Sequence, residues 1–144
     1  MGFGLPAAIG ATFGRPDRTV CVFIGDGGLQ MSIHEFGTIM EQESPVKIIL
    51  LNNNFLGNVR QWQAMFFHHR YSFTPMMNPD YVKIASAYHI PGESVFRRED
   101  LKKAIERMLN TDGPYLLEVG VIEEGNVLPM TPPGGSVNEM LLDC

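Results

Sequence analysis

Two short apolar runs, each followed at once by a polar turn, constrain the fold of this chain more than any other feature. Residues 19–24 (TVCVFI) lead into residues 25–28 (GDGG), and residues 46–51 (VKIILL) lead into residues 52–54 (NNN). Runs of this length that are rich in β-branched and aliphatic side chains predict strands buried on both faces, as in a parallel sheet. Neighbouring strands of a sheet lie about 4.8 Å apart. We therefore expect the two polar turns to lie side by side at one edge of the sheet.

The rest of the chain alternates between helical and strand patterns. Apolar residues recur at helical spacing in residues 29–43, and Pro45 favours an end to that helix because the residue before a proline avoids the α region. A second helix is expected to begin with Asn78 as its N-cap and Pro79 in its first turn. A strand, a helix and a final strand follow, at residues 94–97, 99–110 and 115–122. The pattern predicts an α/β fold, a doubly wound parallel sheet with helices on both faces.

Domain organisation is expected to be simple. Residues 1–122 should form one domain that lacks part of its amino-terminal side, since the chain opens abruptly on a helix of small residues with Pro6 in its first turn. Residues 123–144 contain Pro and Gly and are expected to form a carboxyl-terminal arm.

Composition excludes some classes of function. The formal net charge of −5 disfavours nucleic acid as the main partner. No apolar run approaches the roughly 20 residues that a membrane-spanning helix needs. The two cysteines, Cys21 and Cys144, are too few for a disulfide framework and indicate a reducing compartment. We expect the cytoplasm, with an organelle reached through a transit peptide outside this chain as the alternative. Cys21 lies in an apolar run, where a small buried thiol is expected.

Asp26 and Asn53 carry the chemistry expected at this edge of the sheet. They offer a carboxylate oxygen and an amide oxygen, and hard oxygen ligands suit Mg²⁺. The glycines beside Asp26 allow a close approach of the backbone, and the start of the next helix would favour a phosphate. One carboxylate is too little charge for a metal cage made of protein alone, so the pattern indicates a metal shared with a diphosphate. A turn without function is the competing interpretation, because Gly-Asp-Gly and Asn-rich loops are both common.

The spacing of the two turns narrows the classes of protein to which the chain could belong. The 24 residues 28–51 separate GDG at residues 25–27 from NN at residues 52–53. These two elements at this spacing resemble the thiamine diphosphate motif of the decarboxylase and carboligase superfamily. Further segments are similar to acetolactate synthase (acetohydroxyacid synthase) large subunits, and the similarity runs nearly end to end. These segments are residues 1–11, 45–48, 51–53, 61–63, 69–72, 78–80 and 127–130.

The resemblance implies a role for individual residues. Mg²⁺ would be held by side-chain oxygens of Asp26 and Asn53 and by the backbone carbonyl of Phe55. Cofactor contacts are implied for Met1, which would support the bent cofactor, and for Gly25, Asp26, Gly27, Gly28, Asn53, Phe55, Gly57 and Asn58. Trp62 matches an aromatic residue near the substrate channel, and a core tryptophan is the alternative. Asn58 departs from the family, which usually has Met at this position.

The same resemblance implies a reaction and partners. The enzyme would condense two pyruvates, or pyruvate and 2-ketobutyrate, with loss of carbon dioxide, toward branched-chain amino acids. It implies FAD bound mainly outside this chain, a homodimer or higher oligomer, and often a separate regulatory subunit. No catalytic residue is expected here, because the activating Glu comes from another domain of the partner subunit, so the chain alone should be inactive.

Other functions are also compatible with the sequence. Another thiamine diphosphate carboligase, decarboxylase or oxidase would share the cofactor motif. A non-catalytic phosphate-binding module is a second alternative. A phosphatase of the haloacid dehalogenase type is disfavoured, because the chain has no Asp-x-Asp pair to supply its nucleophile.

Overall fold

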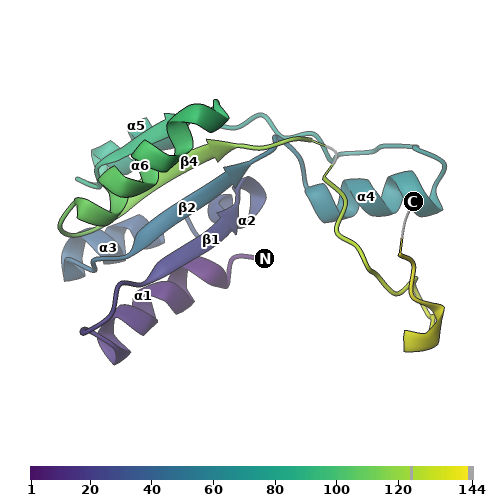
Figure 1. Ribbon diagram of the computed structural model, residues 1–144, viewed down its shortest axis with the longest axis horizontal. Coiled ribbons are helices and arrows are strands. Elements are labelled where there is room, and N and C mark those ends of the chain that lie inside the picture. The colour runs from purple at the N-terminus through teal and green to yellow at the C-terminus, as the bar shows by residue number, and fades with distance from the viewer. Residues whose placement is uncertain (124, 143–144) are drawn as a thin grey trace. The chain divides into compact units, whose positions relative to one another are not determined.

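The computed structural model describes residues 1–123 and 125–142 (Figure 1). The chain divides into two compact units. The first comprises Met1–Asn54 and Met77–Val121, and the second comprises Phe55–Met76 and Ile122–Cys144. Cys144 lies outside the described residues, as do residues 124 and 143 of the expected arm.

A four-stranded parallel sheet forms the centre of the first unit. Its strands lie in the spatial order β1 (Cys21–Gly25), β2 (Lys47–Asn52), β4 (Tyr115–Gly120) and β3 (Gly92–Val95). The register sets Gly25 opposite Leu51 and Asn52 opposite Gly120, so the carboxyl ends of three strands lie at one edge. Every pairing is parallel, and helices connect the strands. The predicted α/β fold class is confirmed.

Four helices contribute to the larger core, on one face of the sheet (Figure 1). They are α1 (Gly4–Gly14), α2 (Asp26–Gln30), α3 (Glu35–Gln42) and α5 (Tyr81–Ala87). Leu5, Phe36 and Tyr81 from these helices are fully buried together with Ile48 and Leu116 of the sheet. Burying large apolar side chains of this kind stabilises the fold by about 1.5–3 kcal/mol each.

Helix α6 (Arg98–Asn110) covers part of the opposite face (Figure 1). Its apolar positions recur every three or four residues, and Ala104 and Met108 are buried against Leu117. The β1 side of this face is different, because Phe23 is 69% exposed and Cys21 is exposed as well. The expectation of a buried Cys21 is therefore wrong: alternation along β1 puts its neighbours into the core and turns Cys21 to the other face.

The helix expected over residues 29–43 is broken into two. α2 ends at Gln30 and α3 begins at Glu35, with a turn between them. The turn is held by tighter i→i+3 hydrogen bonds, from the N–H of Ser32 to the carbonyl of Leu29 and from the N–H of Glu35 to the carbonyl of Ser32, both 3.0 Å. Such bonds change the winding, so the apolar spacing of a continuous helix is lost here.

Helix α5 begins later than expected, and Asn78 does not cap it. Asp80 is the N-cap, and its side chain accepts a hydrogen bond of 3.0 Å from the N–H of Lys83. That hydrogen bond lowers the pKa of Asp80. The Asn78 amide is left for contacts elsewhere in the first unit.

The second unit is built around α4 (Gly57–Phe66). Two glutamines of α4 bind backbone groups through both ends of their amides. Gln61, which is buried, accepts from the N–H of Val127 (2.9 Å) and donates to its carbonyl (3.0 Å). Gln63 does the same with Ser72, at 3.2 and 3.0 Å. The unit also holds a short 3-10 helix, Val137–Glu139. Across the described part of the chain, no helix has the length and apolar character needed to cross a membrane.

Candidate functional site

The two polar turns meet at the carboxyl-terminal edge of the sheet. Asp26 follows β1 directly and is 2% exposed. Its Oδ1 accepts a hydrogen bond from the N–H of Gly27 and its Oδ2 accepts one from the N–H of Asn54, both 2.9 Å long. The expectation that the turns lie side by side is confirmed.

The turn after β2 has a conformation that suits asparagine. Asn54 lies in the left-handed region with φ of 58°, which asparagine adopts more readily than most residues with a Cβ. Its N–H is shared between Asp26 and the side-chain oxygen of Asn52, which is 3.1 Å away. Asn53 lies between them, half-buried. Parallel pairing of β1 with β2 thus joins parts of the chain that are 28 residues apart.

Asn78 is a member of this site that the sequence did not indicate. Its Nδ2 donates to Oδ2 of Asp26 (2.7 Å) and to Oδ1 of Asn52 (2.9 Å), and it lies 3.3 Å from Oδ1 of Asn54. Tyr81 is fully buried behind it and donates from its hydroxyl to Oδ1 of Asn78 (2.9 Å). Burial raises the pKa of Tyr81 to about 12, so the hydroxyl remains a donor at neutral pH. An Asn before Pro is also typical of a helix start, so nothing in the sequence indicated this long-range contact.

Glu118 is a second member of this site that was not predicted from the sequence. It lies on β4, is 6% exposed, and accepts hydrogen bonds from Nδ2 of Asn52 (2.7 Å) and from the hydroxyl of Ser94 (2.6 Å). A single Glu inside the apolar strand sequence YLLEVG was the available signal, because a carboxylate in a buried strand needs polar partners. Those partners lie on neighbouring strands and are not visible in the sequence.

The other predicted site residues lie in several places. Gly25 ends β1, whereas Gly27 and Gly28 belong to α2, beside Asp26. Met1 is 74% exposed ahead of α1. The second unit holds the rest: Phe55 pairs with Pro75, α4 begins with Gly57 and Asn58, and Trp62 lies one turn further along. Trp62 is 41% exposed and packs edge-on against Phe66, so it is not a core residue of this unit.

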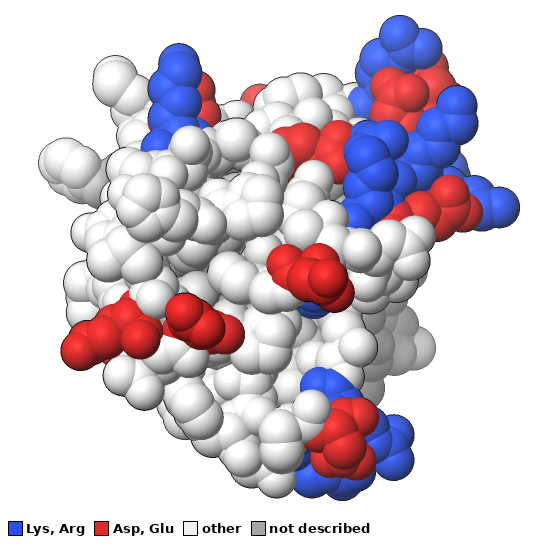
Figure 2. Space-filling model, turned by 90° about the vertical axis from the view of Figure 1, so that its left-hand side faces the viewer, with Lys and Arg blue, Asp and Glu red and all other residues white. Residues whose placement is uncertain are grey.

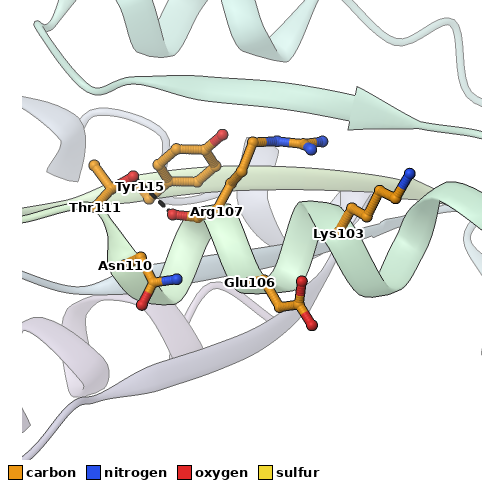
Figure 3. Close-up of a pocket in the computed structure, with 6 residues that line it drawn as sticks. All are labelled: Lys103, Glu106, Arg107, Asn110, Thr111 and Tyr115. Atoms are coloured by element: carbon orange, nitrogen blue, oxygen red, sulfur yellow. Dashed lines mark hydrogen bonds between the residues drawn. The ribbon is translucent and has the colours of Figure 1, made fainter.

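An open hollow of about 570 Å³ lies away from this edge, along α6 (Figure 3). It is lined by Lys103, Glu106, Arg107, Asn110, Thr111 and Tyr115. Tyr115 is the first residue of β4, so the hollow lies toward the amino-terminal end of that strand. Ligands of open α/β sheets bind beyond the carboxyl ends of the strands, which favours the Asp26 edge as the functional site.

Charged side chains of both signs occur on the face drawn in Figure 2. Most basic side chains there lie beside acidic ones, some acidic side chains lie apart from any basic one, and wide uncharged areas separate these groups. Ion pairs among the described residues include Arg97 with Glu99 and Arg107 with Glu93. Within residues 1–123 and 125–142, no group of three or more His, Cys, Asp or Glu could hold a metal ion.

Comparison with known proteins identifies the class. Residues 1–119 match the family described as thiamine pyrophosphate enzyme, C-terminal TPP binding domain. This match covers most of the chain, and the chain belongs to that family. The expected resemblance at superfamily level is thereby confirmed.

Individual relatives narrow the resemblance. The chain is 50% identical over 142 residues to the acetolactate synthase isozyme 2 large subunit of Escherichia coli (strain K12), covering 98% of this chain and 26% of the relative. It is 41% identical over 141 residues to the mitochondrial acetolactate synthase catalytic subunit of Saccharomyces cerevisiae (strain ATCC 204508 / S288c), covering 98% of this chain and 20% of that protein. The resemblance to acetolactate synthase large subunits is confirmed, and the chain spans about a quarter or less of their length.

A solved structure shares the fold. The thiamine diphosphate-dependent 4-hydroxybenzoylformate decarboxylase of Rhodococcus jostii RHA1 superposes with a TM-score of 0.79 at 34% identity. The match covers 85% of this chain and 23% of that one.

Proposed function

We propose that this chain is the part of an acetolactate synthase that binds the diphosphate end of thiamine diphosphate. The observation that carries the proposal is the parallel pairing of β1 with β2, which brings the Asp26 carboxylate to the N–H of Asn54 in the turn after β2. Sequence identities of 50% and 41% to two acetolactate synthases, each over 98% of the chain, support this enzyme in particular. The complete enzyme would condense two pyruvates, or pyruvate and 2-ketobutyrate, and release carbon dioxide.

The residues at the sheet edge fit a Mg²⁺ ion shared with a diphosphate. A carboxylate has about four acceptor positions. Three of those of Asp26 are taken by donors from Gly27, Asn54 and Asn78, so one remains for a cation. The other buried carboxylate at this edge, Glu118, is engaged by Asn52 and Ser94. A single available carboxylate position suits a cation whose remaining ligands are neutral protein oxygens, phosphate oxygens and water.

Each residue of the motif has a proposed part. Asp26 and Asn53 would bind Mg²⁺ through side-chain oxygens, and Phe55 through its backbone carbonyl. Backbone groups of Gly25, Gly27, Gly28, Gly57 and Asn58 would contact the diphosphate, Met1 would support the cofactor, and Trp62 would lie near the 2-keto acid.

The bound cofactor would supply the carbanion chemistry, while this chain would orient it and neutralise the charge of its diphosphate. The group that activates the cofactor would come from another domain, so the 144 residues alone should be inactive. The proposal also includes FAD bound elsewhere, a homodimer or larger oligomer, and a regulatory small subunit. It further includes a role in isoleucine and valine synthesis and a cytoplasmic location.

Product analysis tests the reaction. The complete gene product that contains these residues would be incubated with pyruvate, thiamine diphosphate and Mg²⁺. Acetolactate, detected as acetoin after acid treatment, would support the proposal. Acetaldehyde without acetolactate would instead indicate a decarboxylase, the class of enzyme to which the solved relative belongs.

Cofactor titration tests the site. Thiamine diphosphate would be titrated calorimetrically into the gene product with and without Mg²⁺, beside the variants Asp26→Ala and Asn53→Ala. Binding should require Mg²⁺ and disappear in both variants. Asn110→Ala, an exposed asparagine at the end of α6, is the matched control and should bind as the parent does. Equal binding in all three variants would contradict the assignment of the metal ligands.

A further inference from the structure

Asn78 and Tyr81 together control one oxygen of the Asp26 carboxylate. Oδ2 accepts two hydrogen bonds, from the N–H of Asn54 at 2.9 Å and from Nδ2 of Asn78 at 2.7 Å, whereas Oδ1 accepts one, from the N–H of Gly27. An oxygen of a carboxylate has about two acceptor positions. Oδ2 is therefore filled, and the open position belongs to Oδ1.

The direction of the Asn78 amide is set from both ends. Its Oδ1 accepts from the Tyr81 hydroxyl at 2.9 Å, and an oxygen in that place requires Nδ2 to face the other way, toward Asp26. Tyr81 is fully buried in the core, so the hydroxyl is held by packing.

Asn52 fixes the same direction independently. Its Nδ2 donates to the buried carboxylate of Glu118 at 2.7 Å, which turns its Oδ1 toward Nδ2 of Asn78 at 2.9 Å. The two hydrogens of Nδ2 are thus taken by Asp26 and Asn52, the two closest acceptors. Successive donors therefore run from the Tyr81 hydroxyl through Asn78 to Oδ2 of Asp26. A second branch runs from Nδ2 of Asn78 through Asn52 to the Glu118 carboxylate.

We propose that Asn78, held by Tyr81, is a positioning residue for the metal site: it fills Oδ2 of Asp26 and so directs the cation to Oδ1. The inference rests on the proposed function, in which Asp26 binds the metal. Fixing a carboxylate before the metal arrives removes the cost of ordering it, and partners that orient a ligand typically change metal affinity by about 10–100-fold. The residue acts through Asp26 and makes no contact with substrate in this account.

Mn²⁺ is the probe for the experiment, because its electron paramagnetic resonance signal reports free and bound ion without turnover. Binding would be measured on the complete gene product with thiamine diphosphate present, for the parent and for Asn78→Ala, Tyr81→Phe and Asn110→Ala. Asn78→Ala should weaken Mn²⁺ binding about 10–100-fold. Tyr81→Phe keeps the ring in the core and removes one neutral hydrogen bond, so it should weaken binding about three- to tenfold. Asn110→Ala should leave it unchanged.

Activity provides a readout that a purely structural role would not move. In Asn78→Ala, the Mg²⁺ concentration for half-maximal activity should rise by the same factor as the Mn²⁺ dissociation constant, while kcat at saturating Mg²⁺ stays within about twofold of the parent. If Asn78→Ala does not fold, Tyr81→Phe carries the test by the same two measurements.

The outcomes separate this inference from the proposed function. Parent protein that binds Mn²⁺ equally well with and without thiamine diphosphate would overturn the proposed function and the inference with it. Cofactor-dependent Mn²⁺ binding in the parent, with unchanged affinity in folded Asn78→Ala or Tyr81→Phe, would overturn the inference and leave the function standing.

Discussion

Replacing Glu118 measures how much the buried hydrogen-bond network beneath the site stabilises the fold. In Glu118→Leu, Asn52 and Ser94 both lose their acceptor. Ser94 is exposed and can turn to water, whereas Asn52 is 9% exposed and cannot. One buried donor left unsatisfied costs about 1–3 kcal/mol. For a chain of this size, about 1 kcal/mol lowers Tm by roughly 2–4 °C, so the expected loss is roughly 2–12 °C.

The amide variant separates the hydrogen bonds from the charge. In Glu118→Gln, the carbonyl oxygen can still accept from Asn52, and the Ser94 hydroxyl can accept from the new NH₂ group. Its loss of stability should therefore be about 1 kcal/mol or less. Glu106→Gln, on the exposed surface of α6, is the control and should be neutral. Thermal unfolding followed by circular dichroism is the assay. Equal midpoints for the Leu and Gln variants would refute the reasoning that Asn52 needs this acceptor.

Three further predictions concern packing, pH and the second unit. A Cβ at Gly92 would lie 2.5 Å from a carbonyl oxygen of β4, so Gly92→Ala should destabilise by about 1–3 kcal/mol in urea unfolding. In Gly10→Ala on α1, the new Cβ would have no atom within 4 Å, and alanine loses less backbone freedom in a helix than glycine does. This variant should therefore be more stable by about 0.5–1 kcal/mol, and a loss of stability would contradict the reasoning. The Arg107 hydrogen bond lowers the pKa of Glu93, so stability from this pair is present above the unfolded pKa of about 4.3 and is lost as pH falls through the folded pKa. Glu93→Gln should flatten that acid loss in unfolding curves from pH 7 to 3, and an unchanged pH dependence would count against it. Gln61→Leu removes both hydrogen bonds that hold the backbone at residue 127, so a glutamate-specific protease should cleave the carboxyl-terminal segment faster; equal cleavage rates would show that other contacts hold it.

Local patterns in the sequence were enough to predict the parallel sheet and the proximity of its two polar turns. Residues 19–24 and 46–51 are apolar enough to be strands, and parallel pairing then leaves one arrangement for Asp26 and the turn after β2. These conclusions depend on neighbours along the chain, which a sequence displays directly. Similarity to acetolactate synthases was visible for the same reason, since it rests on short motifs.

Which strand side chains are buried, and which groups they contact, could be determined only from the tertiary structure. Cys21 is exposed because α6 covers the other part of that sheet face, and nothing in the run TVCVFI reports which face a helix covers. The helix over residues 29–43 is broken because i→i+3 hydrogen bonds at Ser32 compete with the continuous winding that its apolar spacing suggests.

The orientation of the Asp26 carboxylate is the clearest case of what only the tertiary structure decided. Sequence alone identified Asp26 as a candidate ligand, because a Gly-Asp-Gly turn after a strand is a local pattern. It assigned Asn78 to a helix cap, since a capping amide and a long-range donor are the same chemical group. Side-chain hydrogen bonds form between groups that the fold brings within about 3.2 Å, whatever their separation in the chain. Here 52 residues separate donor from acceptor.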